Sequence, residues 1–191
     1  TSLIEGYKKY CEVTRKDPDT GKNNYCIVQA EDELAAMGMV LGAGWNGARA
    51  FTSTSGPGVS LMSEFLGYGY FAEIPAVLAG DYNVIPHTHD IWAPAAMLDD
   101  ALRQPESIAA YRALLGQGWT DALATHYPQG GIWTFWDFQA GAWQRDHGFR
   151  IDHLLLSPAV ADRLTRCGVD KDHRGREKAS DHAPTWVELT D

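Results

Sequence analysis

The order of apolar segments between residues 25 and 79 is the feature that most constrains how this chain folds. Apolar runs typical of strands alternate with segments of helical spacing. In chain order these segments are 25–30, 31–45, 48–53, 59–71 and 74–79. Acidic residues open the first helical segment, where the helix dipole favours them, and a glycine-proline turn opens the second. This β-α-β-α-β order predicts an α/β fold with a parallel sheet.

The composition places the chain among globular proteins. Its 191 residues, 45% of them apolar, are enough for one sizeable domain or two small ones. The sequence has no apolar run of membrane-spanning length and no N-terminal pattern of a secretion signal. Its cysteines, Cys11, Cys26 and Cys167, are too few and too scattered for a disulfide framework or a metal cluster. We therefore expect a cytoplasmic protein without a membrane partner.

The charge of the chain gives two opposing indications about nucleic acid. The formal net charge of −9 argues against such a partner, because phosphate binding favours Lys and Arg. The segment 163–178 is nevertheless locally basic, and its basic residues are Arg163, Arg166, Lys171, Arg174, Arg176 and Lys178. This segment is either an ordinary solvated surface or a face for a phosphate backbone, and the sequence leaves both interpretations open.

Acidic residues accompany three apolar runs in the second part of the chain. Asp81 and Asn83 follow the run at 74–79, and in an extended segment side chains two residues apart lie on one face. Asp152 lies inside the run FRIDHLLLSP, while Asp181 and His182 come just before TWVEL. A carboxylate inside an apolar strand is costly to bury without a cation or a hydrogen-bonding partner. Converging Asp, Asn and His side chains suit Mg²⁺ or Mn²⁺, although Gly-Asp-Tyr-Asn alone also fits an ordinary turn.

Residues 79–191 resemble the C-terminal part of exonuclease III, in the endonuclease/exonuclease/phosphatase superfamily. The similarity runs through AGDYNVIP, DDALRQPES, GWTDAL, TFWDF, RIDHLLLSP, GREK and SDHAPTWVEL. The resemblance implies a Mg²⁺-dependent (or Mn²⁺-dependent) phosphodiesterase that cuts DNA at abasic sites in a duplex and trims strands from the 3′ end. It also implies a fold of two packed sheets flanked by helices and built from two similar halves.

The same resemblance assigns expected roles to the acidic and histidine residues. Asp81 would handle the proton of the attacking water or of the leaving group and would also contact the metal. Asn83 would hydrogen-bond to the scissile phosphate. Asp152 would orient His182, which would stabilise charge on the phosphate oxygens, and Asp181 would lie by the metal. Such roles fit phosphoryl transfer, where positioning and charge neutralisation supply most of the acceleration.

The aromatic loop WTFWDF is the segment against which the superfamily packs a flipped abasic sugar. Trp133, Phe135 and Trp136 are therefore candidates for substrate binding, and plain core aromatics are the alternative. The histidines of HTHD, at 87–90, have no third partner at ligand spacing, so we expect a solvated loop there. His153 follows Asp152 and should point to the opposite face of its strand.

Residues 1–77 resemble a different family, through the segment AEDELAAMGMVLGAGWNGARAFTSTSGPGVSLMSEFLGYGYFAEIPAV. It is similar to the pyrimidine-binding domain of the alpha subunit of 2-oxoacid:ferredoxin oxidoreductases. By spacing, Glu33 would be the acid that activates the aminopyrimidine of thiamine diphosphate, and a solvated acid in a first helical turn is the alternative. No GDG followed by a distant Asn is present to hold the diphosphate through Mg²⁺. Thiamine diphosphate is thus expected only under this alternative function.

The two resemblances meet within the strand predicted at 74–79, so the chain is expected to be a chimera. The predicted domains are 1–77, a parallel β-α-β segment, and 78–191, half of a two-sheet α/β sandwich that shares the joining strand. The superfamily's principal metal-ligand glutamate belongs to the other half and has no match here. We expect an impaired metal-dependent DNA phosphodiesterase. The alternatives are an oxidoreductase fragment and a catalytically inactive chimera.

Overall fold

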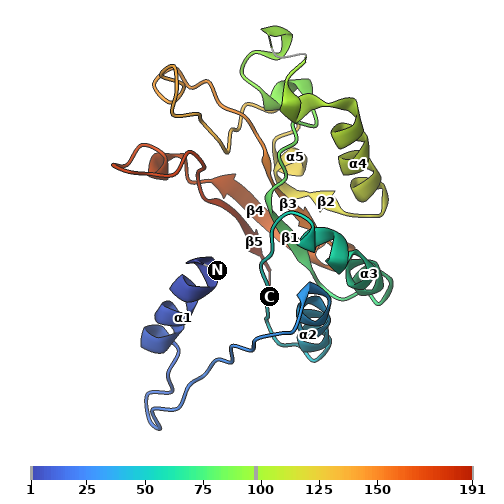
Figure 1. Cartoon of the computed structure of the whole chain (residues 1–191), viewed down its shortest axis with the longest axis vertical. Helices are drawn as coiled ribbons and strands as arrows, with labels where there is room; N and C mark the ends of the chain where they lie inside the picture. The colour runs from blue at the N-terminus through green and yellow to red at the C-terminus, as the bar shows by residue number, and fades with distance from the viewer. Residues whose placement is uncertain (1, 97–98, 191) are drawn as a thin grey trace. The chain divides into compact units, whose positions relative to one another are not determined.

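The computed structural model describes residues 2–96 and 99–190 (Figure 1). The chain divides into two compact units, Thr1–Ile74 (unit 1) and Pro75–Asp191 (unit 2). Each unit has its own cluster of buried apolar side chains, and each is described separately below. In the described part of the chain, every helix is too short or too polar to span a bilayer.

Unit 1 consists of helices joined by irregular segments. Its helices are α1 (Ser2–Thr14), α2 (Glu33–Trp45) and α3 (Gly58–Phe71). The side chain of Asp32 caps α2 by accepting a hydrogen bond from the main-chain N–H of Ala35, at 2.7 Å. The core of the unit lies between α2 and α3 and is formed by Met37, Leu41, Met62 and Ile74. Gly69 of α3 allows this close packing, because a Cβ there would lie 2.9 Å from a methyl carbon of Leu41.

The strands predicted at 25–30 and 48–53 do not form, and both segments lack regular secondary structure. An extended segment becomes a strand only when a neighbouring strand takes up its backbone hydrogen bonds. No strand lies among the described residues of unit 1, and Ile27, Val28 and Phe51 remain exposed. The parallel β-α-β arrangement is therefore corrected to a helical unit.

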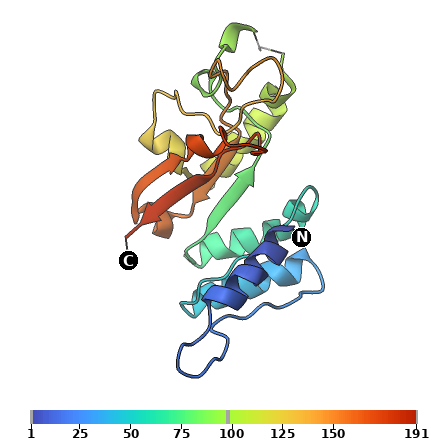
Figure 2. The same cartoon turned by 90° about the vertical axis from the view of Figure 1, so that its left-hand side faces the viewer.

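Unit 2 contains two antiparallel sheets, which Figures 1 and 2 show from two directions. The first sheet has the order β1-β3-β2, with β1 (Val77–Asp81), β3 (Asp152–Leu156) and β2 (Thr120–Asp121). The second sheet pairs β4 (Leu164–Val169) with β5 (Thr185–Leu189). The α-helices are α4 (Pro105–Gly116), α5 (Ala122–His126) and α6 (Pro158–Ala161), and the 3₁₀ turns are η1 (Thr88–Asp90), η2 (Pro94–Ala96), η3 (Ala101–Arg103) and η4 (Lys171–His173). The mixed α/β fold predicted from the sequence is confirmed.

The joining strand predicted at 74–79 is β1, and it pairs within unit 2. Each of its residues from Val77 to Asp81 has a partner on β3, in antiparallel register. Ser157, just after β3, extends this pairing, because Ala76 N–H donates to its Oγ and its own N–H donates to the Ala76 carbonyl, both at 3.0 Å. The sequence predicted that this strand would belong to a sheet shared by both segments. That prediction is wrong, because all of the pairing of β1 is with the second segment.

Strand β3 is central to unit 2, and its side chains alternate between two clusters. Leu154 and Leu156 pack in a core with α5, α6 and the second sheet, whereas Leu155 packs with Tyr111 of α4. Successive side chains of a strand point to opposite faces. Asp152 therefore shares the face of Leu154, toward the second sheet, and His153 shares the face of Leu155, toward α4. This alternation determines which residues reach the candidate site.

Candidate active site

Two carboxylates meet where β1 ends and β3 begins. Asp81, the last residue of β1, and Asp152, the first of β3, are direct partners in the antiparallel register. Like charges directly opposite each other in a sheet destabilise it, so a cation or a donor is needed nearby. Both side chains are part-exposed, at the surface of unit 2 rather than in its core.

His182 supplies that donor. Its Nδ1 lies 2.8 Å from Oδ2 of Asp152 and its Nε2 lies 4.0 Å from Oδ2 of Asp81. A carboxylate only accepts hydrogen bonds, so Nδ1–H donates to Asp152 and Nε2 faces Asp81. The hydrogen bond that His182 donates to Asp152 raises the pKa of His182 above its ordinary value, against the effect of burial, and the charges of Asp152, Asp81 and Asp181 add to this. The site therefore favours an imidazolium.

Asn83 lies beside Asp81, although not in the way that an extended segment would place it. Its main-chain N–H donates to Oδ1 of Asp81 at 2.8 Å and its Nδ2 donates to Oδ2 at 3.1 Å. Asn83 has a φ of 50°, in the left-handed region that few residues other than glycine adopt. The expectation of an extended segment is thus corrected to a local bend, in which the carboxylate of Asp81 holds the amide of Asn83.

The predicted metal ligands, Asp81 and Asp181, are two carboxylates, and their role stays a prediction. Among the residues that the structure describes, no group of three or more His, Cys, Asp and Glu side chains is arranged to hold a metal ion. Both oxygens of Asp81 accept from Asn83, and Asp152 accepts from His182. Asp181 is adjacent to His182, and its Oδ1 accepts from the hydroxyl of Ser180 at 3.4 Å. We therefore assign no chemical step to a metal.

The three aromatic candidates have different environments. Phe135 pairs with His182 in an antiparallel bridge, its ring is 5.0 Å from the imidazole, and it is half-buried beside the site. Trp133 is half-buried against Gly148, where any Cβ would clash with the indole. Trp136 instead lies in the core, 1% exposed, with its Nε1–H donating to Asp146. Of the three, only Phe135 has a contact with a residue of the site, and Trp133 is part-exposed beside Gly148.

Glu33, the candidate in unit 1, is the first residue of α2. It is half-buried, and its carboxylate faces the first turn of α3, since a Cβ at Gly58 would lie 3.0 Å from Oε1 of Glu33. Glu33 also lies in the first turn of α2, as the alternative of a first-turn acid predicts, so its role toward thiamine diphosphate stays a prediction. This contact does not identify a residue that would hold the diphosphate of thiamine diphosphate.

Comparisons with known proteins give relatives for both parts of the chain. Residues 4–93 match the family model described as pyruvate flavodoxin/ferredoxin oxidoreductase, thiamine diphosphate-binding. The alpha subunit of 2-oxoacid:ferredoxin oxidoreductase 1 from Sulfurisphaera tokodaii is 51% identical over 70 residues, which are 35% of this chain and 11% of that protein. Exodeoxyribonuclease III from Haemophilus influenzae is 33% identical over 135 residues, which are 67% of this chain and 51% of the relative.

Solved structures extend the second similarity to the fold. A 3′-5′ exonuclease from Neisseria meningitidis superposes with a TM-score of 0.63 at 31% identity, over 71% of this chain and 56% of the other. An AP endonuclease from Archaeoglobus fulgidus gives a TM-score of 0.63 at 30% identity, over 69% and 51% of the two chains. Both predicted resemblances are confirmed.

Below, residues 78–191 are called the nuclease-like segment and residues 1–77 the oxidoreductase-like segment. The boundary at 77 stays a prediction, and the oxidoreductase family model extends beyond it. The chain spans about half the length of the exodeoxyribonuclease III relative, at 51%, and only 11% of the oxidoreductase subunit.

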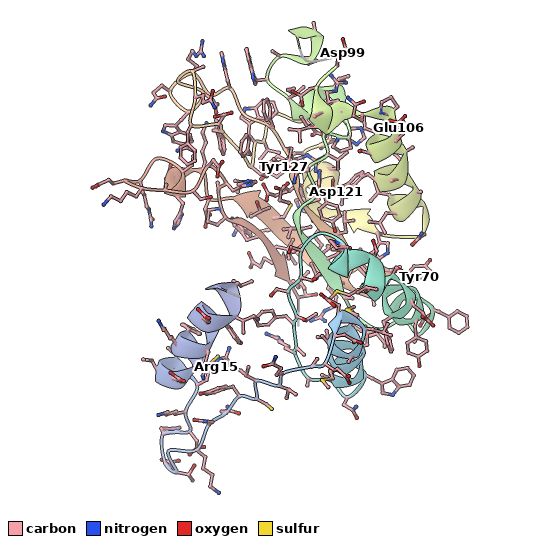
Figure 3. All side chains as sticks on the ribbon, viewed as in Figure 1. Arg15, Tyr70, Asp99, Glu106, Asp121 and Tyr127 are labelled. Atoms are coloured by element: carbon pink, nitrogen blue, oxygen red, sulfur yellow. The ribbon has the colours of Figure 1, made fainter. Side chains whose placement is uncertain are left out.

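The nuclease-like segment also contains a buried ionic cluster that the sequence did not reveal. Asp90, predicted in a solvated loop, is only 1% exposed and forms two hydrogen bonds with Arg150, at 2.7 and 2.9 Å. Nη1 of Arg150 donates to Asp121 at 2.6 Å, and Asp121 is labelled in Figure 3. The visible signals were an arginine between Phe149 and Ile151 in an apolar run and an aspartate at a helix start. The partner of each residue lies far away in the sequence, so the ion pairs could not be recognised from the local pattern.

His153 completes this cluster on the α4 side of β3. Its ring nitrogens lie 3.0 Å from Nη1 of Arg150 and 3.0 Å from the carbonyl oxygen of Val84, and the residue is fully buried. Tyr111 donates to Asp121 at 2.8 Å. Burial alone would raise the pKa of Asp121, but His153 and the Arg150 charge outweigh it and hold that pKa well below its usual value. This cluster fixes the loop at Asp90 and the start of β3, next to Asp152.

The basic segment at 163–178 is only partly available to a partner. Arg174 is buried and donates to the carbonyl of Trp136, and Lys171 pairs with Asp146 at 2.7 Å. Arg176 and Lys178 are exposed in the loop that leads to His182. The exposed part of the segment is solvated surface, and its contact with a phosphate backbone stays a prediction.

Proposed function

We propose that this chain is a DNA phosphodiesterase of the exonuclease III and abasic-site endonuclease class, with impaired activity. The observation that carries the proposal is the contact of His182 with Asp152 at 2.8 Å, with Asp81 4.0 Å from the other ring nitrogen. These residues come from three distant parts of the chain and meet at one edge of unit 2. The similarity to exodeoxyribonuclease III and to nuclease structures supports this chemistry.

The reaction would proceed by displacement at phosphorus. Water attacks the phosphorus and forms a new P–O bond, and Asp81 accepts the proton of that water. The P–O bond to the leaving oxygen breaks, and this alkoxide takes a proton from solvent to leave as the alcohol. The protonated His182 stabilises the charge that develops on the phosphate oxygens, and Asp152 fixes the imidazole with Nε2 directed at the substrate. Asn83 has a second amide N–H for a phosphate oxygen, because its first is donated to Asp81.

The proposed substrate is double-stranded DNA with an abasic site, or a DNA strand with a free 3′ end. A flipped abasic sugar would pack against Phe135, whose ring lies 5.0 Å from that of His182, and against the part-exposed Trp133 of the same loop. The exposed Arg176 and Lys178 would contact the phosphate backbone. One solved relative is described as a 3′ phosphatase bound to a product DNA hairpin, which supports DNA as the polymer.

A nicking assay on an abasic-site duplex, in Mg²⁺ or Mn²⁺, tests the proposal. We expect cleavage far below that of a full-length relative, because loss of a metal ligand should exceed the roughly 10- to 100-fold cost of changing its supporting shell. The double variant Asp81→Asn with His182→Ala should abolish it, and His126→Ala, on the exposed end of α5, should not. Cleavage that survives the double variant comes from a contaminant and refutes the nuclease function.

A second candidate function is a fragment of a thiamine-diphosphate enzyme, favoured by the family match over residues 4–93 and by the half-buried Glu33. The sequence contains no GDG motif to hold a diphosphate, so we expect no measurable binding of thiamine diphosphate by calorimetry. Micromolar affinity that is lost in Glu33→Gln would replace the nuclease proposal with this one. If neither DNA cleavage nor binding of thiamine diphosphate is detected, the third alternative, a catalytically inactive chimera, is supported.

A further inference from the structure

We propose that Trp92 and His147 form a stacking platform for a nucleobase, a few nucleotides from the phosphate at His182. This inference rests on the proposed function, since it takes DNA as the polymer at the site. The two rings are parallel within 3°, with centroids 3.5 Å apart. Neither residue belongs to a motif identified in the sequence, and neither is among the candidate site residues described above.

The main chain on both sides holds the platform in place. Trp92 N–H donates to the carbonyl of Gly148 at 3.2 Å, and Ile91 pairs with Phe149 in an antiparallel bridge. Ile91 is buried, whereas the Trp92 side chain next to it is 41% exposed. The indole is thus ordered by His147 on one face before any ligand binds, which lowers the entropy cost of binding.

The platform is connected to His182 through consecutive backbone bridges. Ile91 pairs with Phe149, Phe149 with Phe135, and Phe135 with His182. Paired strands lie about 4.7–4.9 Å apart, so these three steps span about 14 Å. A DNA strand advances about 3.4 Å per nucleotide in a duplex, and this span therefore corresponds to about four nucleotides. A strand whose phosphate lies at His182 would reach Trp92 with a neighbouring base.

The chemistry of the platform suits a base rather than a phosphate. The indole of Trp92 offers no charge to a phosphate, whereas every nucleobase has a π face that stacks on an indole without regard to sequence. A structural role would explain a buried aromatic pair, but the Trp92 ring is exposed. Next to His147, the carboxylate of Asp146 is already paired with Lys171, at 2.7 Å, which limits its repulsion of the backbone.

Binding of a fluorescent single-stranded oligonucleotide, followed by anisotropy in EDTA, tests the platform without cleavage. Trp92→Ala should weaken binding by about 5- to 150-fold, the range for loss of one base–aromatic stack, and Trp92→Phe should keep most of the affinity. The salt dependence should be unchanged, because stacking releases no counterions. Trp45→Ala is the matched control, since Trp45 is 64% exposed on α2 in unit 1.

The outcomes separate the platform from the nuclease function. The platform is overturned if Trp92→Ala binds like Trp45→Ala, or if the unmodified chain binds no oligonucleotide. It stands if Trp92→Ala alone weakens binding and Trp92→Phe restores it, even when the abasic-site duplex is never cut. In that case the nuclease function fails and the DNA-binding surface remains. Circular dichroism of each variant verifies that the fold is intact.

Discussion

Asp81 and Asp152 face each other as direct partners at one end of the β1–β3 pair. The imidazole of His182 is hydrogen-bonded to the second of these carboxylates and lies 4.0 Å from the first. Two carboxylates at one edge would repel each other if no cation were present. The charge state of His182 thus affects the local stability of this end of the sheet.

We expect the pKa of His182, measured by NMR titration, to lie above the 6.5 of an unperturbed histidine. Asp152→Asn should lower it markedly, and Asp81→Asn should lower it less, because Asp81 lies farther from the ring. A pKa raised in the folded state stabilises the fold fully below the unfolded value and loses this effect as the pH rises through the folded value. The stability of the unmodified chain should therefore fall across that interval. An unchanged His182 pKa in Asp152→Asn would contradict the assignment.

Asn83→Ala and Asn83→Gly form a matched pair for the bend after β1. Both variants lose the amide that binds Asp81, but glycine tolerates the φ of 50° and alanine does not. We expect the free energy of unfolding in urea to be lower for the alanine variant by about 1 kcal/mol, the usual cost of a left-handed residue. Equal free energies of unfolding for the two variants would show that the backbone after β1 changes its conformation to accommodate alanine. Both variants should reduce cleavage, since both lose the donor to phosphate.

Arg150→Met should destabilise unit 2 by about 3–5 kcal/mol, the usual cost of removing one partner from a buried ion pair. The change leaves Asp90 and Asp121 buried without their shared cation. Arg166→Met is the matched control, because Arg166 is 72% exposed and its pair with Glu188 is solvated. Urea denaturation of both variants compares them. A small effect at Arg150 would mean that the cluster is hydrated in solution.

Millimolar Mg²⁺ or Mn²⁺ should leave the melting temperature of the DNA-free chain unchanged. A ligand stabilises a protein only when it binds the native state, and the retained carboxylates Asp81 and Asp152 already accept hydrogen bonds from neighbouring side chains. A rise in melting temperature that disappears in Asp181→Asn would show that the predicted ligands Asp81 and Asp181 suffice for a cation. The magnesium dependence expected from the resemblance to exonuclease III would then apply to this chain.

Some contacts of the candidate site could be predicted from the sequence where the signal was local. Asp152 inside an apolar strand and His182 before another were recognisable, and the alternation of β3 correctly predicted that His153 would point toward the other face. The strands at 25–30 and 48–53 failed because a strand depends on neighbours that the local pattern does not contain. The partners of Arg150 could not be read either, because Asp90 and Asp121 lie 60 and 29 residues away in the chain.

Those same separations have a consequence for how unit 2 assembles. The bond between Asp90 and Arg150 closes a loop of 60 residues, and the Ala76–Ser157 contact beside β1 closes one of 81. Closing long loops costs chain entropy before any contact compensates it, so such pairings form slowly. The edge that carries Asp81 and Asp152 is built by this late pairing. The two carboxylates therefore come together only when this long-range pairing of β1 with β3 forms.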